Sequence, residues 1–293
     1  MLTDLKALLK DAREKRYAVP AFDVSNYEMI RAVIETCAEE KSPCIFMTLK
    51  PDLEGNGLKM LSSLMKTADE IYKDLPVCIH LDHATSFDDI KAAIDVGYTS
   101  VMFDGSVLPF EENVKRTKEV VDYAHVRNIS VEAELGHVAD AVAGSEDKIL
   151  SATTNEDIEK CMTDVGEAKE FIERTGVDCL AVAIGTAHGV YVSAPVLQFK
   201  RLSEINEESS VPLVMHGGSG TPDKDVQKAI SLGITKINIY SEVLHALNSN
   251  LKEKLNSISN LSMWPVYVYE NSYKAMKEVI RKKIRTFGSN GRI

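Results

Sequence analysis

The sequence predicts an α/β protein folded as a single-domain (β/α)8 barrel, the TIM barrel. Three observations lead to this prediction: eight short apolar runs, longer stretches of helical periodicity between them, and no linker or composition shift anywhere in residues 1–293. Each apolar run is too short for a helix and rich in Val and Ile, as expected of parallel strands buried on both faces. A doubly wound open sheet is the alternative, but it rarely needs eight strands.

The predicted strands and helices alternate along the chain. The strands are AVPAFDV (18–24), SPCIFMT (42–48), VCIHLDH (77–83), SVMFDGS (100–106), SVEAELG (130–136), CLAVAIG (179–185), PLVMHGG (212–218) and KINIYSE (236–242). Helical periodicity separates them, for example over 27–40, 110–128 and 225–233. Two segments break the pattern: a long connection at about 137–155, which we expect to be mobile, and residues 258–268 among the C-terminal helices.

Composition and charge narrow the possible function classes. The net charge of −10 argues against a nucleic-acid partner or an anionic membrane surface. No apolar run reaches the length of a membrane span, and the amphipathic N-terminal segment does not resemble a signal peptide. The five cysteines lack CxxC spacing, and their odd number indicates reduced thiols. We therefore expect a cytoplasmic protein.

Chemically active residues gather at the predicted carboxyl ends of the strands, which is where barrel enzymes hold their active sites. Of the 7 histidines, those at this rim are His83, His137, His188 and His216. The acids and the amide at the same rim are Asp23, Asp82, Asp104, Glu132, Glu134 and Asn238. We expect His80, inside the third strand, to be a hydrogen-bonded core residue.

Three of the rim histidines, His83, His188 and His216, follow strands three, six and seven. Three imidazoles with an open fourth position form the pattern of a catalytic zinc site, although three separate rim histidines are the plainer interpretation. Asp82 then serves as a general acid or base, or orients a neighbouring imidazole. Asp104 and Glu134 are candidates for a second divalent or monovalent cation, or belong to an ordinary hydrogen-bonded rim.

A glycine-rich loop, HGGSG (216–220), follows the seventh strand and leads into a helix. Ser241 follows the eighth strand, and we expect it to cap the next helix. Loops after strands seven and eight with a helix N-terminus behind them form the recurrent phosphate site of this barrel. A phosphate site beside a zinc site predicts a small phosphorylated substrate.

Taken together, these motifs resemble the class II, zinc-dependent ketose-phosphate aldolases, which include the fructose- and tagatose-bisphosphate aldolases. The resemblance runs from about residue 3 to FGSNGR (287–292) and rests on VPAF (19–22), HLDH (80–83), SVMFDGS (100–106), VEAELGHV (131–138), LAVAIGTAHGVY (180–191), PLVMHGGSG (212–220) and KINI (236–239). It implies one catalytic zinc per chain held by His83, His188 and His216, with Asp104 and Glu134 at a second-cation or resting-metal position.

The resemblance also implies the reaction. Asp82 is the implied acid/base for cleavage of the C3–C4 bond of a ketose phosphate, which yields dihydroxyacetone phosphate and an aldehyde. The implied dihydroxyacetone-phosphate site comprises Gly189, Gly217, Gly218, Ser219, Asn238, Ile239, Tyr240 and Ser241. A loop acid returns a proton, and Glu146 is the candidate for it. The family leads us to expect a homodimer or homotetramer.

The sequence departs from the family at three positions that bear on the substrate. Asp23 stands where asparagine is usual, and Tyr240 where alanine or aspartate is common. Val266 stands where the bisphosphate aldolases carry an arginine that grips the distal phosphate, and valine forms no such contact. We therefore expect the substrate to be a ketose 1-phosphate, and we expect the enzyme not to require a second phosphate at the distal end.

Other activities remain open at this point. Fructose- or tagatose-1,6-bisphosphate cleavage is the nearest alternative. A different metal-dependent barrel enzyme, such as a hydrolase or an isomerase, would use the same rim. A non-catalytic partner subunit is a further possibility, but such a subunit is expected to lose metal ligands, and all three histidines are present.

Overall fold

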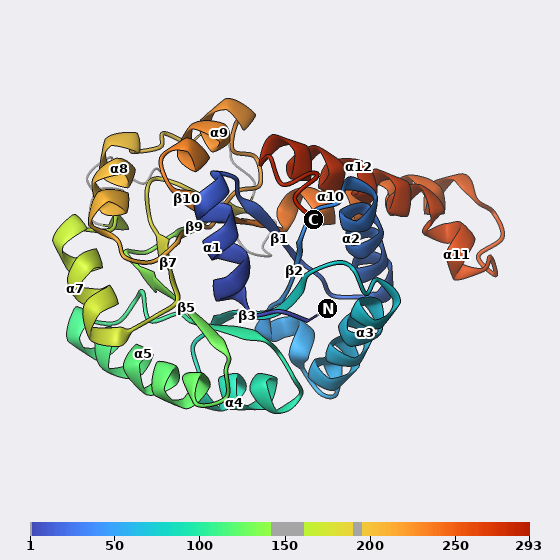
Figure 1. The fold of residues 1–293 in the computed structure, drawn as a ribbon. Helices are drawn as coiled ribbons and strands as arrows, with labels where there is room; N and C mark the ends of the chain where they lie inside the picture. The colour runs from blue at the N-terminus through green and yellow to red at the C-terminus, as the bar shows by residue number, and fades with distance from the viewer. Residues whose placement is uncertain (1, 142–160, 190–194) are drawn as a thin grey trace.

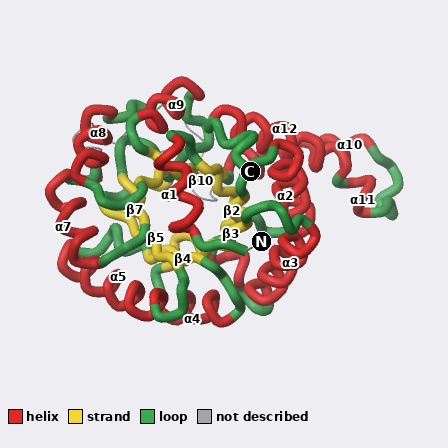
Figure 2. Tube along the Cα trace, in the orientation of Figure 1, coloured by secondary structure: helices red, strands yellow, loops and turns green. Residues whose placement is uncertain are grey.

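The computed structural model describes residues 2–141, 161–189 and 195–293 and consists of a closed barrel of parallel strands ringed by helices (Figures 1 and 2). The strands lie in the order β1-β2-β3-β4-β5-β7-β9-β10, and β10 pairs with β1 to close the barrel. The predicted TIM barrel is therefore confirmed. Most of the connection at 137–155, including Glu146, lies outside the described residues.

All eight barrel strands fall on the predicted apolar runs. They are β1 (Val19–Asp23), β2 (Cys44–Thr48), β3 (Val77–Ala84), β4 (Ser100–Phe103), β5 (Ser130–Leu135), β7 (Cys179–Val182), β9 (Leu213–Met215) and β10 (Ile234–Ile239). Two short strands were not predicted: β6 (Ala139–Ala141) and β8 (Ala187–Gly189) pair in parallel as a separate sheet. This sheet joins the connections that follow β5 and β7.

Most of the helices bury an apolar face, whereas the short helices at 50–53 and 265–268 have no buried residue. Those described are α1 (Leu5–Lys15), α2 (Tyr27–Glu40), the 3-10 helix η1 (Lys50–Leu53), α3 (Gly57–Ile71), α4 (Phe87–Asp95), α5 (Phe110–His125), α7 (Val165–Thr175), α8 (Phe199–Glu208), α9 (Asp223–Ser231), α10 (Ser241–Ser257), α11 (Pro265–Val268) and α12 (Glu270–Thr286). None of them is both long and apolar enough to cross a bilayer. The five cysteines are all free thiols.

Helix α1 closes the amino-terminal end of the barrel and lies across its centre in Figure 1. The Asp4 side chain caps the helix by accepting a hydrogen bond from the Ala7 amide at 2.8 Å. Leu5 and Leu9 are fully buried, in one cluster with residues such as Cys78 and Val214 from the barrel strands. Because α1 fills this end, a ligand reaches the barrel interior from the carboxyl ends of the strands.

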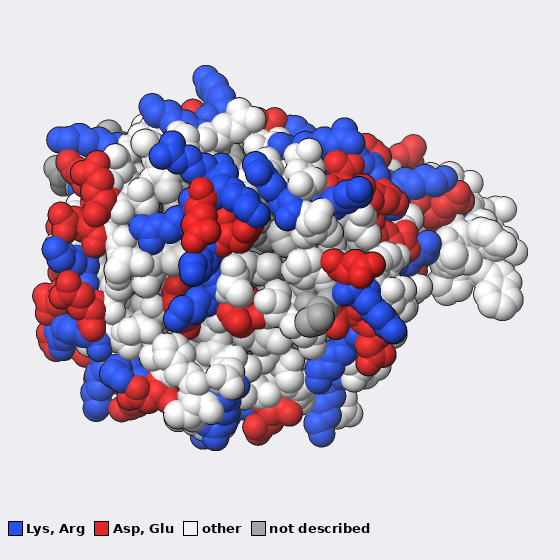
Figure 3. Space-filling model, in the orientation of Figure 1, with Lys and Arg blue, Asp and Glu red and all other residues white. Residues whose placement is uncertain are grey.

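A segment that we call the arm, residues 255–268, projects from the barrel at the end of α10 (Figure 1). It interrupts the C-terminal helices where the sequence predicted a break, and it contains the short helix α11. The arm has no charged residue, and its projecting tip is uncharged in Figure 3. Its exposed apolar side chains are Leu255, Leu261, Trp264, Val266 and Tyr267. Several large exposed apolar side chains within one short segment are typical of an interaction site.

Candidate metal centre and active site

Strand β3 places two consecutive side chains, those of Asp82 and His83, at the barrel mouth. Neighbouring residues of a regular strand point to opposite faces, so this arrangement needs a break in the strand. The break is present: the register with β4 shifts between Leu81 and Ala84, and His83 has a positive φ of 47°. A non-glycine residue in this region is uncommon and costs backbone strain, which is most often found at functional sites.

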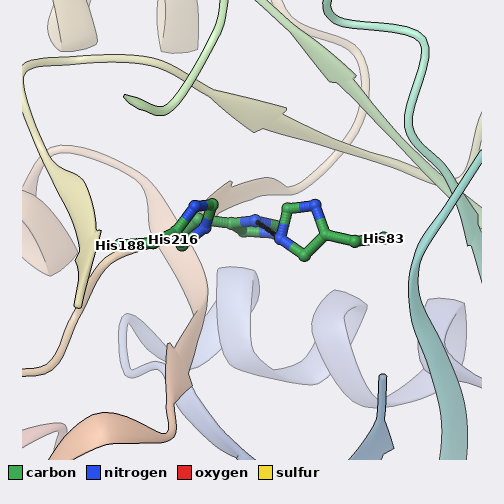
Figure 4. Close-up of side chains that lie close together, drawn as sticks. All are labelled: His83, His188 and His216. Carbon is green, nitrogen blue, oxygen red and sulfur yellow. Dashed lines mark hydrogen bonds between the residues drawn. The ribbon is translucent and has the colours of Figure 1, made fainter. Parts of the chain in front are cut away.

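The three predicted zinc ligands converge on one point, as Figure 4 shows. His83 comes from β3, His188 from β8 and His216 from the residue after β9. One nitrogen atom from each ring lies within 4.8 Å of the others. His216 Nδ1 and His83 Nε2 are 2.9 Å apart. Tetrahedral zinc with Zn–N bonds of 2.0–2.1 Å needs ligand nitrogens about 3.3 Å apart, so the three rings fit such an ion.

Two of these rings are hydrogen-bonded to carboxylates through the nitrogen that faces away from the cluster. His83 Nδ1 lies 2.9 Å from Asp104 Oδ2, which turns Nε2 of that ring toward the cluster. His216 Nε2 lies 2.9 Å from Glu132 Oε1, which turns Nδ1 of that ring toward the cluster. A carboxylate behind a ligand histidine fixes the ring orientation and the tautomer in metal sites. The donor set and its supports therefore suit a divalent metal.

The acids predicted for a second cation lie beside this cluster. Asp104 and Glu134 form, with His83, a second group of potential ligand atoms within 4.8 Å of one another. Glu134 Oε1 accepts a hydrogen bond from the Val138 amide, while Oε2 is buried with no hydrogen-bond partner among the described residues. Burial, and then the Asp104 charge, raise the pKa of Glu134 to about 8. Glu134 Oε2 lies 3.5 Å from His216 Nδ1, and a cation bound at this site would give that oxygen a partner.

Asp82 is almost completely buried and is held in one orientation. The Asn238 amide donates to both of its oxygens, at 3.2 and 3.0 Å. Burial alone would raise the pKa of Asp82, but the His83 charge and the nearby His80 ring, whose Nε2 lies 3.7 Å from Asp82 Oδ1, bring it well below its usual range. Burial and the Asp82 charge have the opposite result at Asp23, whose pKa is well above its usual range. Of these two acids, Asp82 is therefore the ionised one, the form that is able to accept a proton.

The predicted phosphate loop lies between β9 and α9. Gly217 has a φ of +66°, and a Cβ there would lie 2.4 Å from the Ala187 carbonyl oxygen, so no larger residue fits. The Ser219 hydroxyl accepts hydrogen bonds from the Tyr240 amide at 3.3 Å and the Glu242 amide at 3.4 Å. The prediction that Ser241 caps α10 was wrong, because Ser241 is the first residue of the helix itself. The N-cap residue is Tyr240, whose side chain makes no capping hydrogen bond. The hydroxyl of Ser219, in the neighbouring loop, accepts the backbone hydrogen bonds at this helix end instead.

The remaining predicted substrate residues differ in their exposure to the mouth. Gly218 donates its amide hydrogen to the Asn238 carbonyl at 3.2 Å, and Gly189 ends β8 with a φ of 102°. Ile239 is fully buried in the hydrophobic core, so its side chain faces away from the mouth. Asp23 is buried at the end of β1, with Oδ1 lacking a hydrogen-bond partner in the described part of the chain. His137, the fourth rim histidine, contacts the Ser106 hydroxyl at 3.1 Å.

Sequence reasoning missed the interior ion pair beneath the histidines. Lys236 Nζ lies 2.8 Å from Glu132 Oε2, and both side chains are fully buried. The spacing of these residues was an indication that both face the barrel interior. Lys236 stands two residues before Asn238, and Glu132 stands two residues before Glu134, so Lys236 and Asn238 share one side of their strand, as do Glu132 and Glu134. His80 is buried and bonded through Nδ1 to Ser100 Oγ at 2.8 Å, as expected of a core histidine.

Comparisons with known proteins agree with this geometry. Residues 3–292 match the family model described as fructose-bisphosphate aldolase class-II. The crystal structure of the YdjI aldolase from Escherichia coli K12 is 38% identical and superposes with a TM-score of 0.85, covering 100% of this chain and 99% of that one. A candidate fructose-1,6-bisphosphate aldolase from Coccidioides immitis is 30% identical, with a TM-score of 0.83 and coverage of 98% and 97%. Fructose-bisphosphate aldolase from Campylobacter jejuni, at 20% identity, TM-score 0.82 and coverage of 100% and 97%, shares the fold.

Proposed function

Because the chain belongs to the class II fructose-bisphosphate aldolase family, we propose that it cleaves a ketose 1-phosphate into dihydroxyacetone phosphate and an aldehyde, without requiring a distal phosphate. The chain is a class II aldolase and hence a lyase. The observation that carries the proposed cleavage chemistry is the three-histidine cluster beside an ionised, buried Asp82. A cytoplasmic location is part of the proposal and is supported by the five free cysteines.

His83, His188 and His216 would hold a catalytic zinc ion, which supplies a Lewis acid for substrate oxygens when it is bound. Asp82 accepts the proton of the C4 hydroxyl as C4 becomes the aldehyde carbonyl. The Asn238 amide keeps both Asp82 oxygens in place for this transfer. The electron pair of the broken C3–C4 bond remains with C3, which then takes a proton from a loop acid. Glu146, which lies outside the described residues, is our candidate for that acid.

The 1-phosphate would lie against the loop Gly217–Gly218–Ser219 and the start of α10. The lack of side chains at the two glycines lets an anion approach the backbone, and the helix N-terminus favours negative charge. Tyr240 and Ser241 border the same place at the end of β10. A substrate anchored here reaches across the histidine cluster to Asp82 on β3.

Beyond Asp82, the aldehyde half would meet an acidic wall rather than a basic one. Asp23 at the end of β1 and Asp52 in η1 lie close enough to each other for the Asp52 charge to help raise the pKa of Asp23. Burial, followed by the charges of Asp52 and Asp23, raises the pKa of Tyr240 to about 12. Lys50, on the same η1 segment, is already paired with Asp89 at 3.0 Å. These groups suit hydroxyls of the substrate better than a second phosphate.

The arm supports a homodimer or a higher homo-oligomer. Trp264 is 74% exposed and Val266 54% exposed, and the surrounding 255–268 segment carries no charge. Aromatic and apolar residues of this kind are typical of the centre of a protein interface. A second copy of the chain is the partner that the family leads us to propose.

The test compares substrates under one set of conditions. The rate of dihydroxyacetone phosphate release from fructose and tagatose 1,6-bisphosphates is measured against the corresponding 1-phosphates, with zinc and with a chelator. A missing charge-assisted contact of about 1.5–3 kcal/mol removes about a ten- to hundredfold preference for the distal phosphate. We expect chelator-sensitive cleavage of the 1-phosphates. A kcat/KM for either bisphosphate more than about tenfold above every 1-phosphate would overturn the distal part of the proposal. Cleavage unaffected by the chelator would overturn the metal part.

A further inference from the structure

Beneath the three-histidine cluster, Glu132 contacts Lys236 through one carboxylate oxygen in a buried ion pair. Its other carboxylate oxygen contacts a predicted zinc ligand. Glu132 on β5 accepts from Lys236 on β10 through Oε2 at 2.8 Å. Its other oxygen, Oε1, lies 2.9 Å from His216 Nε2, just after β9. All three side chains are fully buried. The three groups therefore form one chain, from Lys236 through Glu132 to His216, inside the barrel.

A buried lysine and glutamate are costly to desolvate, and apolar residues of similar volume often stabilise a core as well or better. Packing alone therefore does not explain why a lysine and a glutamate occupy these two buried positions. Here both carboxylate oxygens have a donor, and the second donor is the imidazole that faces the cluster. The ammonium group of Lys236, 2.8 Å from Oε2, only donates hydrogen bonds, and its charge favours the ionised form of Glu132.

An ionised carboxylate only accepts hydrogen bonds, so the nitrogen of His216 that faces Glu132 must carry the ring proton. A metal-ligating imidazole is in the neutral form, which has a single N–H. That N–H is at Nε2, and Nδ1 keeps its lone pair. Nδ1 is the atom that lies 2.9 Å from His83 Nε2 and 3.5 Å from Glu134 Oε2, in the cluster.

We propose that Glu132 and Lys236 are positioning residues that fix His216 as the tautomer with a free Nδ1, and that Lys236 acts through Glu132. Lys236 holds Glu132 in its acceptor state and in the rotamer that faces His216. Without Lys236, Glu132 Oε2 loses its charged donor, so the carboxylate is no longer held with Oε1 toward Nε2 of His216. This inference rests on the proposed role of His216 as a zinc ligand.

The variants are Glu132→Gln, Lys236→Met and the double variant, with Asp178→Asn as the matched control. Asp178 is a buried carboxylate that likewise contacts a histidine nitrogen, His125 Nε2 at 2.9 Å, but it lies just before β7, at the opposite end of the barrel. The zinc dissociation constant of each metal-free protein is measured by competition with a chelator. The His216 tautomer is read by long-range proton–nitrogen correlation in protein labelled with ¹⁵N histidine.

We expect Glu132→Gln and Lys236→Met each to weaken zinc binding by about 10- to 100-fold. Because Lys236 acts through Glu132, the double variant should lose no more than Glu132→Gln alone. Asp178→Asn should bind zinc as the unmodified protein does. Losses that add in the double variant, or equal losses in the Asp178→Asn control, would indicate general destabilisation and overturn the inference.

The unmodified protein supplies a second test that does not depend on any variant folding. Its metal-free form should show the His216 proton on Nε2, and finding it on Nδ1 would overturn the inference directly. The same zinc titration separates this outcome from a failure of the proposed function. If the unmodified protein binds no zinc, the zinc site itself is refuted; if it binds zinc and the variants match it, only the positioning role is refuted.

Discussion

Replacing Asp82 by alanine should abolish carbon–carbon cleavage while leaving the metal in place. Asp82 Oδ2 lies 3.8 Å from His83 Nε2, beside the ring cluster but outside it, so its loss removes no predicted zinc ligand. General acid–base groups contribute about 100- to 10,000-fold to a rate, or about 3–5.5 kcal/mol of barrier. We expect kcat for cleavage to fall within that range.

The same change has a stability cost that the structure allows us to bound. Asn238 Nδ2 donates to both oxygens of Asp82, and Asn238 is buried, so the variant leaves this donor without its acceptor. An unsatisfied buried donor costs about 1–3 kcal/mol. Asp82→Asn keeps an acceptor in the same place, so it should recover part of that stability but none of the proton transfer.

The assay follows two reactions of one preparation whose zinc content has been determined. Cleavage is followed by release of dihydroxyacetone phosphate, and carbanion chemistry by exchange of the α-proton of dihydroxyacetone phosphate with solvent. Cleavage should fall far more than exchange, because the proposed mechanism assigns exchange to the loop acid rather than to Asp82. A cleavage loss below about tenfold in a fully zinc-loaded variant would refute the acid/base role. Equal losses in both reactions would show that Asp82 acts on the site as a whole.

The remaining predictions concern the metal and the loop. His188→Ala should lose zinc and activity together, which metal analysis and the cleavage assay check on the same sample; full zinc occupancy with normal turnover would contradict the ligand assignment. Burial alone would lower the pKa of His83, but the Asp82 charge and the Asp104 hydrogen bond raise it from 6.5 to about 10 in the metal-free protein. At pH 7 zinc must therefore displace about one proton, so its affinity should rise by up to about tenfold per pH unit between pH 6.5 and 10, and calorimetry in buffers of different ionisation enthalpy should detect that proton. Glu146→Gln should slow α-proton exchange with no change in zinc content, and unchanged exchange would assign the proton to another acid or to solvent.

Strand positions and rim residues were predictable because each depends on local sequence and on one property of the fold. Parallel barrel strands are buried on both faces, so runs such as CIFMT and CLAV stand out, and their carboxyl ends share one rim. His83, His188 and His216 could thus be grouped although they lie far apart in the sequence.

What the sequence did not reveal depends on how side chains from distant segments meet. The Glu132–Lys236 contact joins residues 104 positions apart, and nothing local in either strand indicates its partner. The capping of α10 by Ser219 similarly depends on the distance between two loops, and the nearer Ser241 was the wrong choice. The positive φ of His83 is a local property, but the residue type alone does not predict it: histidine adopts positive φ more often than most non-glycine residues, yet only in a small fraction of cases.

The break in β3 also limits how this active site is able to change. Asp82 and His83 are joined by a single peptide bond, so a backbone shift at that point of the strand moves the proposed proton acceptor and a proposed metal ligand together. Substitutions that press on β3 from the core should therefore alter metal affinity and proton transfer in parallel. Asp23 and Asp52 lie on other elements, β1 and η1, so substitutions there do not alter the peptide bond between Asp82 and His83. New aldehyde specificities are thus most accessible through the β1–η1 side of the mouth, while the chemistry stays tied to β3.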